Sequence, residues 1–389
     1  MASIRKRSWI SGGEEKQAWI ADYVDQHKKR RLKTFKTKKA ADEWLVKTRG
    51  EVRDGTHSPE STSVTVGEAC RRWLQHVELV GNDKGPVEPA TLRSYRLCAQ
   101  HHVLPVFANV RLSQLSTPRI HSYAAQLLAG NMPDAPDGEK KPRSRAMASK
   151  ALWTLKAILS YAQRTGLCPV NVAAPVKLGK SDRDAEPIQV PDREHVKAWI
   201  AAATPRWRPL VILAAYSGLR ASELRALTWG NVDLKAGTVT VAQRADRFRT
   251  IGRPKSRTSR RTVPLMAFVL QELRELHLRQ GRPEGDQLVF PTERGGVMAH
   301  ANFAERGFYK PQRRAGLVDA AGKPLYSVHA LRHFFAWVCI KGGVPPKELQ
   351  SFMGHATLSM TMDVYGGWWP DPEGAQTRIA AAERIALGS

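Results

Sequence analysis

The amino-acid sequence predicts a multidomain, mainly helical chain with small β-sheets in its first and last parts. Three observations lead to this fold class: strand-like alternation confined to the first residues, amphipathic helical patterns after residue 64, and two segments dense in turn-forming or charged residues. With 389 residues, the chain can bury a separate core in each of two or three domains. We predict domains over residues 1–60, 64–176 and 186–389.

The first part is predicted to be a three-stranded sheet followed by one helix. Apolar and polar residues alternate over Ile4–Ile10, Ala18–Asp25 and Arg31–Lys36, and Gly12-Gly13 supplies a turn between the first two strands. Residues 40–46 then place their apolar side chains in one stripe at helical spacing. A linker dense in turn residues follows over residues 54–59.

This first part is also strongly basic. Residues 1–50 contain 14 Lys and Arg against 6 Asp and Glu, with aromatic residues interleaved. A small basic sheet of this kind suits docking in a DNA groove, and a solvated basic face on an ordinary domain is the alternative. The candidate DNA-binding residues are Arg5, Lys6, Arg7, Lys28, Lys29, Arg30, Arg31 and Lys33.

The second part is predicted to be entirely helical, and nothing in it suggests catalysis. Thr117-Pro118 indicates an N-cap followed by proline at the first helical position. We interpret this part as a helical clamp or scaffold. Its predicted helices cover Val66–Val80, Ala90–His102, Arg119–Ala129 and Ala146–Thr165. A loop over Asn131–Arg145 and a charged linker over Lys177–Pro191 interrupt the helical pattern.

The third part is mostly helical with a short β segment, and it contains the candidate chemistry. An apolar helix over Leu210–Ala215 ends at Gly218, and a new helix begins near Ser222. Arg220 therefore lies at a bend, with Glu223 three residues on, so the carboxylate can hold the guanidinium by charge-assisted hydrogen bonds. A guanidinium held in this way can bind two phosphate oxygens, and a purely structural ion pair is the alternative.

A basic hairpin follows. Val239–Val241 and Arg261–Pro264 are predicted strands, which places Lys255 at the hairpin tip. A lysine there can reach a leaving oxygen and protonate it. A basic loop that only touches phosphates is the alternative, and Arg253 or Arg257 could take the place of Lys255.

The next candidates are His329 and Arg332, three residues apart on a predicted helix and therefore on one face of it. They offer a titratable imidazole and a permanent cation to a single site. We predict no metal there, because the sequence lacks H-E-x-x-H, His333 has no acidic or cysteine partner nearby, and the cysteines form no C-x-x-C pair. Further on, Gly354-His355 precedes Tyr365; each alone is typical of a turn or a packed aromatic residue.

Taken together, these segments resemble the signature of the tyrosine recombinases, the integrases of phages and mobile islands. The order and spacing of Arg220, His329, Arg332, His355 and Tyr365 agree with it, as do the flanking Ser-Gly-Leu-Arg, His-Ala-Leu-Arg-His and Met-Gly-His sequences. The first part resembles the arm-type DNA-binding domain of integrases, and the second part resembles their helical core-binding domain. The third part would be the catalytic domain with its C-terminal tail.

The resemblance implies a strand-transfer reaction on DNA. Tyr365 would attack a backbone phosphate and leave a 3′-phosphotyrosyl bond and a free 5′-hydroxyl, without ATP or any cofactor. Lys255, which falls where the hairpin lysine of the family is expected, would protonate the departing 5′-oxygen. His329 would take the tyrosine proton.

The remaining site residues would stabilise and orient. Arg220 and Arg332 would form a preorganised pair of cations around the negative charge that grows on the phosphate oxygens. His355 would hydrogen-bond a phosphate oxygen, and Glu223 would orient Arg220 as a supporting residue. The whole set would integrate and excise a mobile element.

Composition agrees with a DNA partner. The chain has 61 Lys and Arg against 36 Asp and Glu, a formal net charge of +25, which favours a polyanion because neutralised phosphates release counterions. No apolar run approaches the roughly 18 residues that span a bilayer, and no lipidation motif or secretory signal is present. We therefore expect no membrane partner and a cytoplasmic, nucleoid-associated protein in a bacterial host.

The expected partners are double-stranded attachment sites and further copies of the chain. The family works as a homotetramer on DNA in which each C-terminal tail docks on a neighbour, and Pro372–Leu387 has a helical pattern that suits this role. A tail that packs on its own domain is the alternative. A DNA-bending host factor and an excisionase are expected by analogy with the family.

Other functions fit parts of the pattern. A non-catalytic DNA-binding regulator derived from an integrase is the main alternative, although the full set of candidate residues is present. A chromosome-dimer resolvase or an invertase would share the chemistry, but the extra basic first part disfavours the compact resolvase type. A type IB topoisomerase would share the nucleophile, and a metal-dependent nuclease would need an acidic cluster that the sequence lacks.

Overall fold

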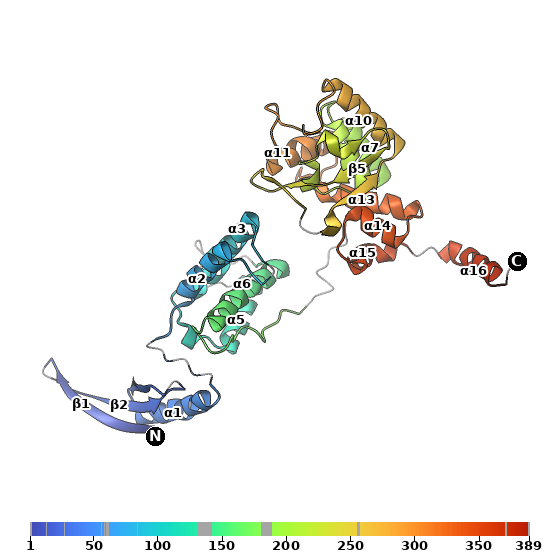
Figure 1. Ribbon diagram of the computed structural model, residues 1–389. Helices are drawn as coiled ribbons and strands as arrows, with labels where there is room; N and C mark the ends of the chain where they lie inside the picture. Colours follow the sequence, from blue (N-terminus) through green and yellow to red (C-terminus); the bar gives the residue numbers. More distant parts are fainter. Residues whose placement is uncertain are drawn as a thin grey trace. The chain divides into compact units, whose positions relative to one another are not determined.

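The computed structural model describes residues 2–12, 14–26, 28–55, 57, 59, 62–83, 85–130, 142–179, 189–254, 257–369 and 372–387. The chain forms two compact units, Met1–Ala185 and Glu186–Ser389 (Figure 1). It is mostly helical with small antiparallel sheets, which confirms the predicted fold class. Within the described ranges, no helix is both long and apolar enough to cross a membrane.

A three-stranded antiparallel sheet begins the first unit. Strands β1 (Ser3–Ser11), β2 (Glu14–Val24) and β3 (Arg30–Phe35) pair in the order β1-β2-β3, and helix α1 (Lys38–Arg53) covers one face. The three predicted strands are confirmed, each with slightly different ends. Thr37 caps α1, since its hydroxyl accepts a hydrogen bond from the Ala40 amide at 3.2 Å.

A helical bundle makes up the rest of the first unit. It differs from the sequence prediction in two places. The helix predicted over Ala90–His102 changes to a π turn at Ala99, close to Pro105, whose missing N–H removes one i→i−4 hydrogen bond. The N-cap of the helix after it is Ser116 rather than Thr117, because Ser116 accepts the Arg119 amide. The elements are α2 (Val66–Leu79), α3 (Pro89–Cys98), η1 (Ala99–Val103), α4 (Leu104–Phe107), η2 (Leu112–Gln114), α5 (Thr117–Ala129) and α6 (Arg145–Arg164).

The second unit is built around two apolar helices, α8 (Arg208–Ser217) and α13 (Val328–Lys341), which pack on each other. Helix α8 ends at Gly218, which has a left-handed φ of 65°. A side chain at this position would collide with Phe335 of α13, because an added Cβ would lie 2.5 Å from its Cδ1 atom. Glycine therefore lets the chain turn tightly beside α13 and enter the short helix α9 (Ala221–Leu224).

The remaining elements surround this helical pair. Strand β5 (Thr238–Val241) lies between β4 (Val232–Asp233) and β8 (Arg261–Pro264) in one antiparallel sheet, as the predicted β segment requires. The others are α7 (Arg193–Ala202), η4 (Trp229–Asn231), β6 (Arg244–Ala245), β7 (Ile251–Gly252), η5 (Arg257–Ser259), α10 (Ala267–Arg279), α11 (His300–Ala304), η6 (Glu305–Tyr309), α12 (Lys310–Arg314), α14 (Pro346–Met353), α15 (Leu358–Tyr365), η7 (Gly366–Trp368) and α16 (Pro372–Leu387).

The hairpin predicted between β5 and β8 is more elaborate than a single turn. Strands β6 and β7 form a second ribbon within it, and its turn is closed by Asp246, whose carboxylate accepts the amides of Phe248 and Thr250 at 2.8 Å. The tip of this ribbon is therefore near residue 248. Lys255, predicted at the tip, follows the ribbon in sequence and lies outside the described residues.

Candidate active site

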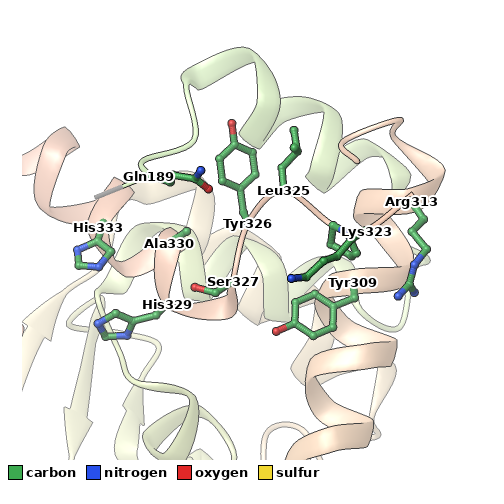
Figure 2. Close-up of a pocket in the computed structure, with 11 residues that line it drawn as sticks. Gln189, Tyr309, Arg313, Lys323, Leu325, Tyr326, Ser327, His329, Ala330 and His333 are labelled. Atoms are coloured by element: carbon green, nitrogen blue, oxygen red, sulfur yellow. The ribbon is translucent and has the colours of Figure 1, made fainter. Parts of the chain in front are cut away.

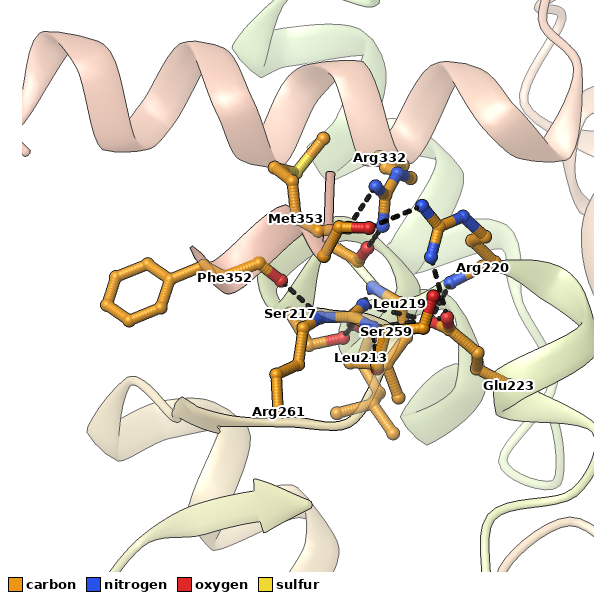
Figure 3. Close-up of polar contacts among 12 residues, drawn as sticks. Leu213, Ser217, Leu219, Arg220, Glu223, Ser259, Arg261, Arg332, Phe352 and Met353 are labelled. Carbon is orange, nitrogen blue, oxygen red and sulfur yellow. Dashed lines mark hydrogen bonds and ion pairs between the residues drawn. The ribbon is translucent and has the colours of Figure 1, made fainter. Parts of the chain in front are cut away.

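A buried carboxylate organises the centre of the second unit. Glu223 on α9 is 4% exposed, and its two oxygens accept four hydrogen bonds of 2.8–3.1 Å from Arg220 and Arg261 (Figure 3). Burial alone would raise the pKa of Glu223, but the hydrogen bonds and charge of Arg261, together with Arg220, hold that pKa below its ordinary value. The carboxylate therefore stays ionised, and the predicted contact between Arg220 and Glu223 is present.

The sequence patterns did not single out Arg261, which begins strand β8. Its side chain is 3% exposed, and besides Glu223 it donates to the carbonyls of Phe352 at 2.6 Å and Ser259 at 3.1 Å. It thereby ties the hairpin, α9 and the end of α14 together. A signal for it existed, because strand alternation places Arg261 on the same buried face as Val263.

Arg332 reaches the same centre from α13. It is 2% exposed and donates to the carbonyls of Gly218 and Met353. Arg220 donates to the neighbouring carbonyl of Gly354 at 3.0 Å. Burial, with the nearby charges of Arg220 and Arg261, lowers the pKa of Arg332 to about 9.

Three arginines thus meet at this centre: Arg220 and Arg261 bond Glu223, and Arg332 lies within electrostatic range of it. Arg220, Arg261 and Arg332 contribute three positive charges and Glu223 a single negative one, so this cluster carries two uncompensated positive charges. Arg220 keeps a third of its side chain exposed, whereas the other two are buried. The site therefore presents a rigidly held guanidinium over a cationic background, which suits a phosphate.

Tyr365 lies at the end of α15 and is 1% exposed. Its ring packs against Trp368 at 4.9 Å and stacks on His355 at 6.2 Å between centroids. The Tyr365 hydroxyl lies 2.8 Å from Nδ1 of His333. Burial raises the pKa of Tyr365 to about 12, although Arg332 and Arg220 oppose that rise, so the phenol is protonated at neutral pH.

The histidines of the site make different contacts. His355 bonds Thr361 through Nδ1 at 2.9 Å, and burial together with the arginines lowers its pKa to about 4. His329 and Arg332 are both on α13, as predicted, but His329 is exposed and its ring meets that of His333 edge-on at 4.8 Å. The described partner of the Tyr365 hydroxyl is therefore His333, a residue that the sequence offered only as a conceivable metal ligand.

A cavity of about 610 Å³ opens beside these histidines. His329 and His333 line one side of it, and Tyr309, Arg313 and Lys323 line the other (Figure 2). Its wall combines aromatic and cationic side chains, the two kinds that contact bases and phosphates in nucleic-acid sites. In the part of the chain that the structure describes, no group of three His, Cys, Asp or Glu side chains could hold a metal ion.

Residues 191–366, which contain the arginine cluster, the site histidines and Tyr365, match the phage integrase family. The chain therefore contains a phage integrase family domain. The integrase-family chain is similar to the prophage integrase IntR of Escherichia coli (strain K12), with 26% identity over 82% of this chain and 80% of that protein. It is also similar to a tyrosine recombinase XerC-like protein of Caldanaerobacter subterraneus subsp. tengcongensis, with 25% identity over 93% of this chain and 94% of that protein.

Solved structures share the fold of this integrase-family chain. The Tn1549 transposon integrase in complex with a circular intermediate DNA has a TM-score of 0.63 and 18% identity, covering 83% of this chain and 100% of that one. A lambda integrase tetramer bound to a Holliday junction has a TM-score of 0.59 and 16% identity, covering 89% of this chain and 92% of that one. Both are therefore likenesses of fold.

The candidate DNA-binding residues of the integrase-family chain fall on two faces of the N-terminal sheet. The register pairs Arg5 with Ile20, and Lys33 with Ala21, so these two cations point to opposite sides. Because Ala21 packs toward α1, Lys33 lies on the helix-covered face, where its ammonium is 4.9 Å from the Trp44 ring centroid. By the same alternation, Arg7 and Arg30 share the open face with Arg5, and Lys6 and Arg31 share the covered face with Lys33. Lys28 and Lys29 lie in the turn between β2 and β3.

Proposed function

We propose that this chain is a site-specific DNA recombinase that cleaves and rejoins strands through a covalent bond to Tyr365. The observation that carries the proposal is the cluster of three arginines around Glu223, a cationic site next to a buried, protonated tyrosine. Attack of a tyrosine on a phosphodiester requires such positive charge, because negative charge grows on the phosphate oxygens. Family membership supports the same reaction class.

The reaction follows from the charges. The Tyr365 hydroxyl attacks a backbone phosphate, so the Oη–P bond forms as the bond from phosphorus to the 5′-oxygen breaks. The bond energy is kept in the 3′-phosphotyrosyl link, so rejoining requires no ATP. Arg220 and Arg332 stabilise the negative charge that grows on the non-bridging oxygens, and their anchoring before the reaction lowers the reorganisation that the transition state requires.

The other residues have supporting roles in this proposal. Lys255 gives its proton to the departing 5′-oxygen. His355 donates a hydrogen bond to a phosphate oxygen, and His329 is the acceptor of the tyrosine proton that the family resemblance implies. Glu223 orients Arg220 and Arg261 as a positioning residue.

The three predicted domains take distinct roles. Residues 1–60 form an arm-type DNA-binding domain, residues 64–176 a core-binding domain, and residues 186–389 the catalytic domain. In the arm domain, the open sheet face with Arg5, Arg7 and Arg30 contacts DNA, because α1 covers the other face.

The proposed assembly is a tetramer on paired attachment sites, where it integrates or excises a mobile element. A lambda integrase forms a tetramer on a Holliday junction, and its fold resembles this one. Helix α16 leaves Ile379, Ile385 and Leu387 at least 71% exposed, as expected of a tail that docks on a neighbouring copy. A DNA-bending host factor and an excisionase would act on this assembly.

The test is a covalent trap. A nicked duplex that carries the core site, sought in DNA flanking the gene, is incubated with the full chain in EDTA, so that the cleaved fragment diffuses away. We expect an adduct that resists denaturation, forms without metal and is absent with Tyr365→Phe. If the unmutated chain binds this DNA but forms no adduct, a non-catalytic DNA-binding regulator becomes the better proposal.

The arm domain is tested separately by deleting residues 1–60. We expect loss of binding at sites distant from the crossover point, with cleavage at the core site retained. DNase footprints that are the same with and without residues 1–60 would contradict the arm role but not the catalytic one.

A further inference from the structure

The structure points to a proton acceptor for Tyr365 that the family resemblance did not supply. We propose that His333, rather than His329, takes the proton of the Tyr365 hydroxyl as that oxygen attacks the DNA phosphate. The proposal rests on the proposed recombinase function and assigns one further catalytic residue to it. Its basis is the 2.8 Å contact between Nδ1 of His333 and Oη of Tyr365.

Geometry favours His333 over its neighbour. A general base must lie within about 2.6–3.2 Å of the atom that loses the proton, and His333 meets this condition in the DNA-free protein. The ring of His329 instead meets the ring of His333 edge-on at 4.8 Å between centroids, and both histidines line the cavity. His329 is thus placed to meet a phosphate from the solvent side, while His333 lies between it and the nucleophile.

The site also orients the nucleophile. The Tyr365 ring is fixed between His333, His355 and Trp368, so its hydroxyl has little rotational freedom. In the tautomer with a proton on Nε2, Nδ1 of His333 accepts the phenolic O–H. His333 and the Tyr365 hydroxyl are therefore hydrogen-bonded before DNA binds, so the attacking oxygen already contacts its proton acceptor.

The proton balance is complete. As the Oη–P bond forms, the proton passes to Nδ1 of His333, and the 5′-oxygen leaves with a proton from Lys255 or water. His333 keeps its proton throughout the covalent intermediate. When the 5′-hydroxyl attacks the phosphotyrosine, its proton passes back to Lys255 or water and His333 returns its own proton to the departing Oη, so His333 serves both directions of the reaction.

The charges around His333 keep the proton on Tyr365 until a phosphodiester is bound. Burial, with His329 and Arg332, lowers the pKa of His333 to about 4, while that of Tyr365 is about 12. At rest the proton therefore stays on Tyr365. A bound phosphodiester adds negative charge that raises the pKa of His333, and bonding to phosphorus acidifies the phenol. The titratable and charged groups facing His333 are His329, Arg332 and Tyr365, with Tyr309, Arg313, Lys323 and Tyr326 across the cavity.

The decisive experiment measures single-turnover cleavage of the nicked duplex as a function of pH. His333→Gln keeps a polar side chain but cannot carry the proton, so we expect cleavage to slow by about 10²–10⁴-fold at neutral pH. The unmutated rate should change much less with pH between pH 6 and 8 than the variant rate, since His333 accepts the proton from the un-ionised phenol. The variant rate should rise about tenfold per pH unit, because only the ionised fraction of Tyr365 then reacts.

A matched control is available in the same unit. His195 also bonds a tyrosine hydroxyl through Nδ1, at 2.7 Å from Tyr326, but does not line the cavity. His195→Gln should leave both the cleavage rate and its pH profile unchanged. His333→Asn, a smaller acceptor, serves if the Gln variant does not fold; thermal unfolding and gel shifts verify that each variant folds and binds DNA.

A second substrate separates the two proton transfers. With sulfur in place of the 5′-bridging oxygen, the leaving group needs no proton, so Lys255→Ala should recover cleavage and His333→Gln should not. An unchanged pH profile in His333→Gln, a faster reaction, or the same slope in His329→Gln would overturn the proposal. Absence of any adduct with the unmutated chain would instead overturn the recombinase function itself.

Discussion

Replacing Glu223 with glutamine should destabilise the second unit strongly. The substitution keeps the shape of the side chain but removes the only negative charge in the arginine cluster and turns one acceptor into a donor facing Arg220 or Arg261. Arg261 would remain 3% exposed without its counterion. Breaking a buried pair in this way costs about 3–5 kcal/mol, because the remaining charge stays desolvated.

The assay is thermal unfolding of the full chain, measured by calorimetry. For a unit of this size, that loss lowers the midpoint of the corresponding transition by about 6–20 °C. The control is Glu272→Gln, which removes an ion pair of the same 2.9 Å length whose arginine, Arg208, is 45% exposed. Exposed pairs contribute about 0.2–1 kcal/mol, so the control should change little. Equal midpoints for both variants would show that Glu223 does not hold the cluster together.

Two further outcomes follow from the structure. The pKa of Glu223 is lowered on folding, so its contribution to stability is complete above the ordinary carboxyl pKa of 4.5 and is lost as the pH falls through the folded value. Thermal midpoints of the second unit should therefore drop below about pH 4.5 in the unmutated chain and less so in Glu223→Gln. Gly218→Ala should destabilise the same unit by about 1–3 kcal/mol in urea titrations, because the new Cβ meets Phe335 and the φ is left-handed. The paired substitution Gly50→Ala, in α1 where an added Cβ meets nothing within 4 Å, should stabilise the first unit by about 0.5–1 kcal/mol; a stabilised Gly218→Ala or a destabilised Gly50→Ala would contradict the reasoning.

Local signals predicted the elements and most of the site. The end of α8 at Gly218 and the N-terminal position of Arg220 in α9 follow from glycine and from the change in apolar pattern. The sharing of one helix by His329 and Arg332 follows from their spacing. Each of these features depends on a few adjacent residues, which is why sequence periodicity is sufficient to predict it.

Contacts between distant elements were harder to predict. The hydroxyl of Tyr365 meets His333 across 32 positions of sequence. Arg261 was missed because a cation in a short strand is ordinarily exposed, and only the fold brings Glu223 beneath it. Pairings of this kind depend on how helices pack, which the apolar pattern of each helix does not encode alone.

The way the arginines are held explains how the site can be both rigid and cationic. A carboxylate would orient a guanidinium but also cancel its charge, whereas a backbone carbonyl orients it and leaves the charge intact. Among the described residues, Arg332 is anchored on the carbonyls of Gly218 and Met353, and Arg220 divides its contacts between Glu223 and the carbonyl of Gly354. Those carbonyls are available because α8 and α14 both end in left-handed glycines, Gly218 and Gly354, beside α13. The carbonyls at two helix ends thus orient the arginines in place of further acidic residues. The positive charge that remains is what a phosphate in transfer requires.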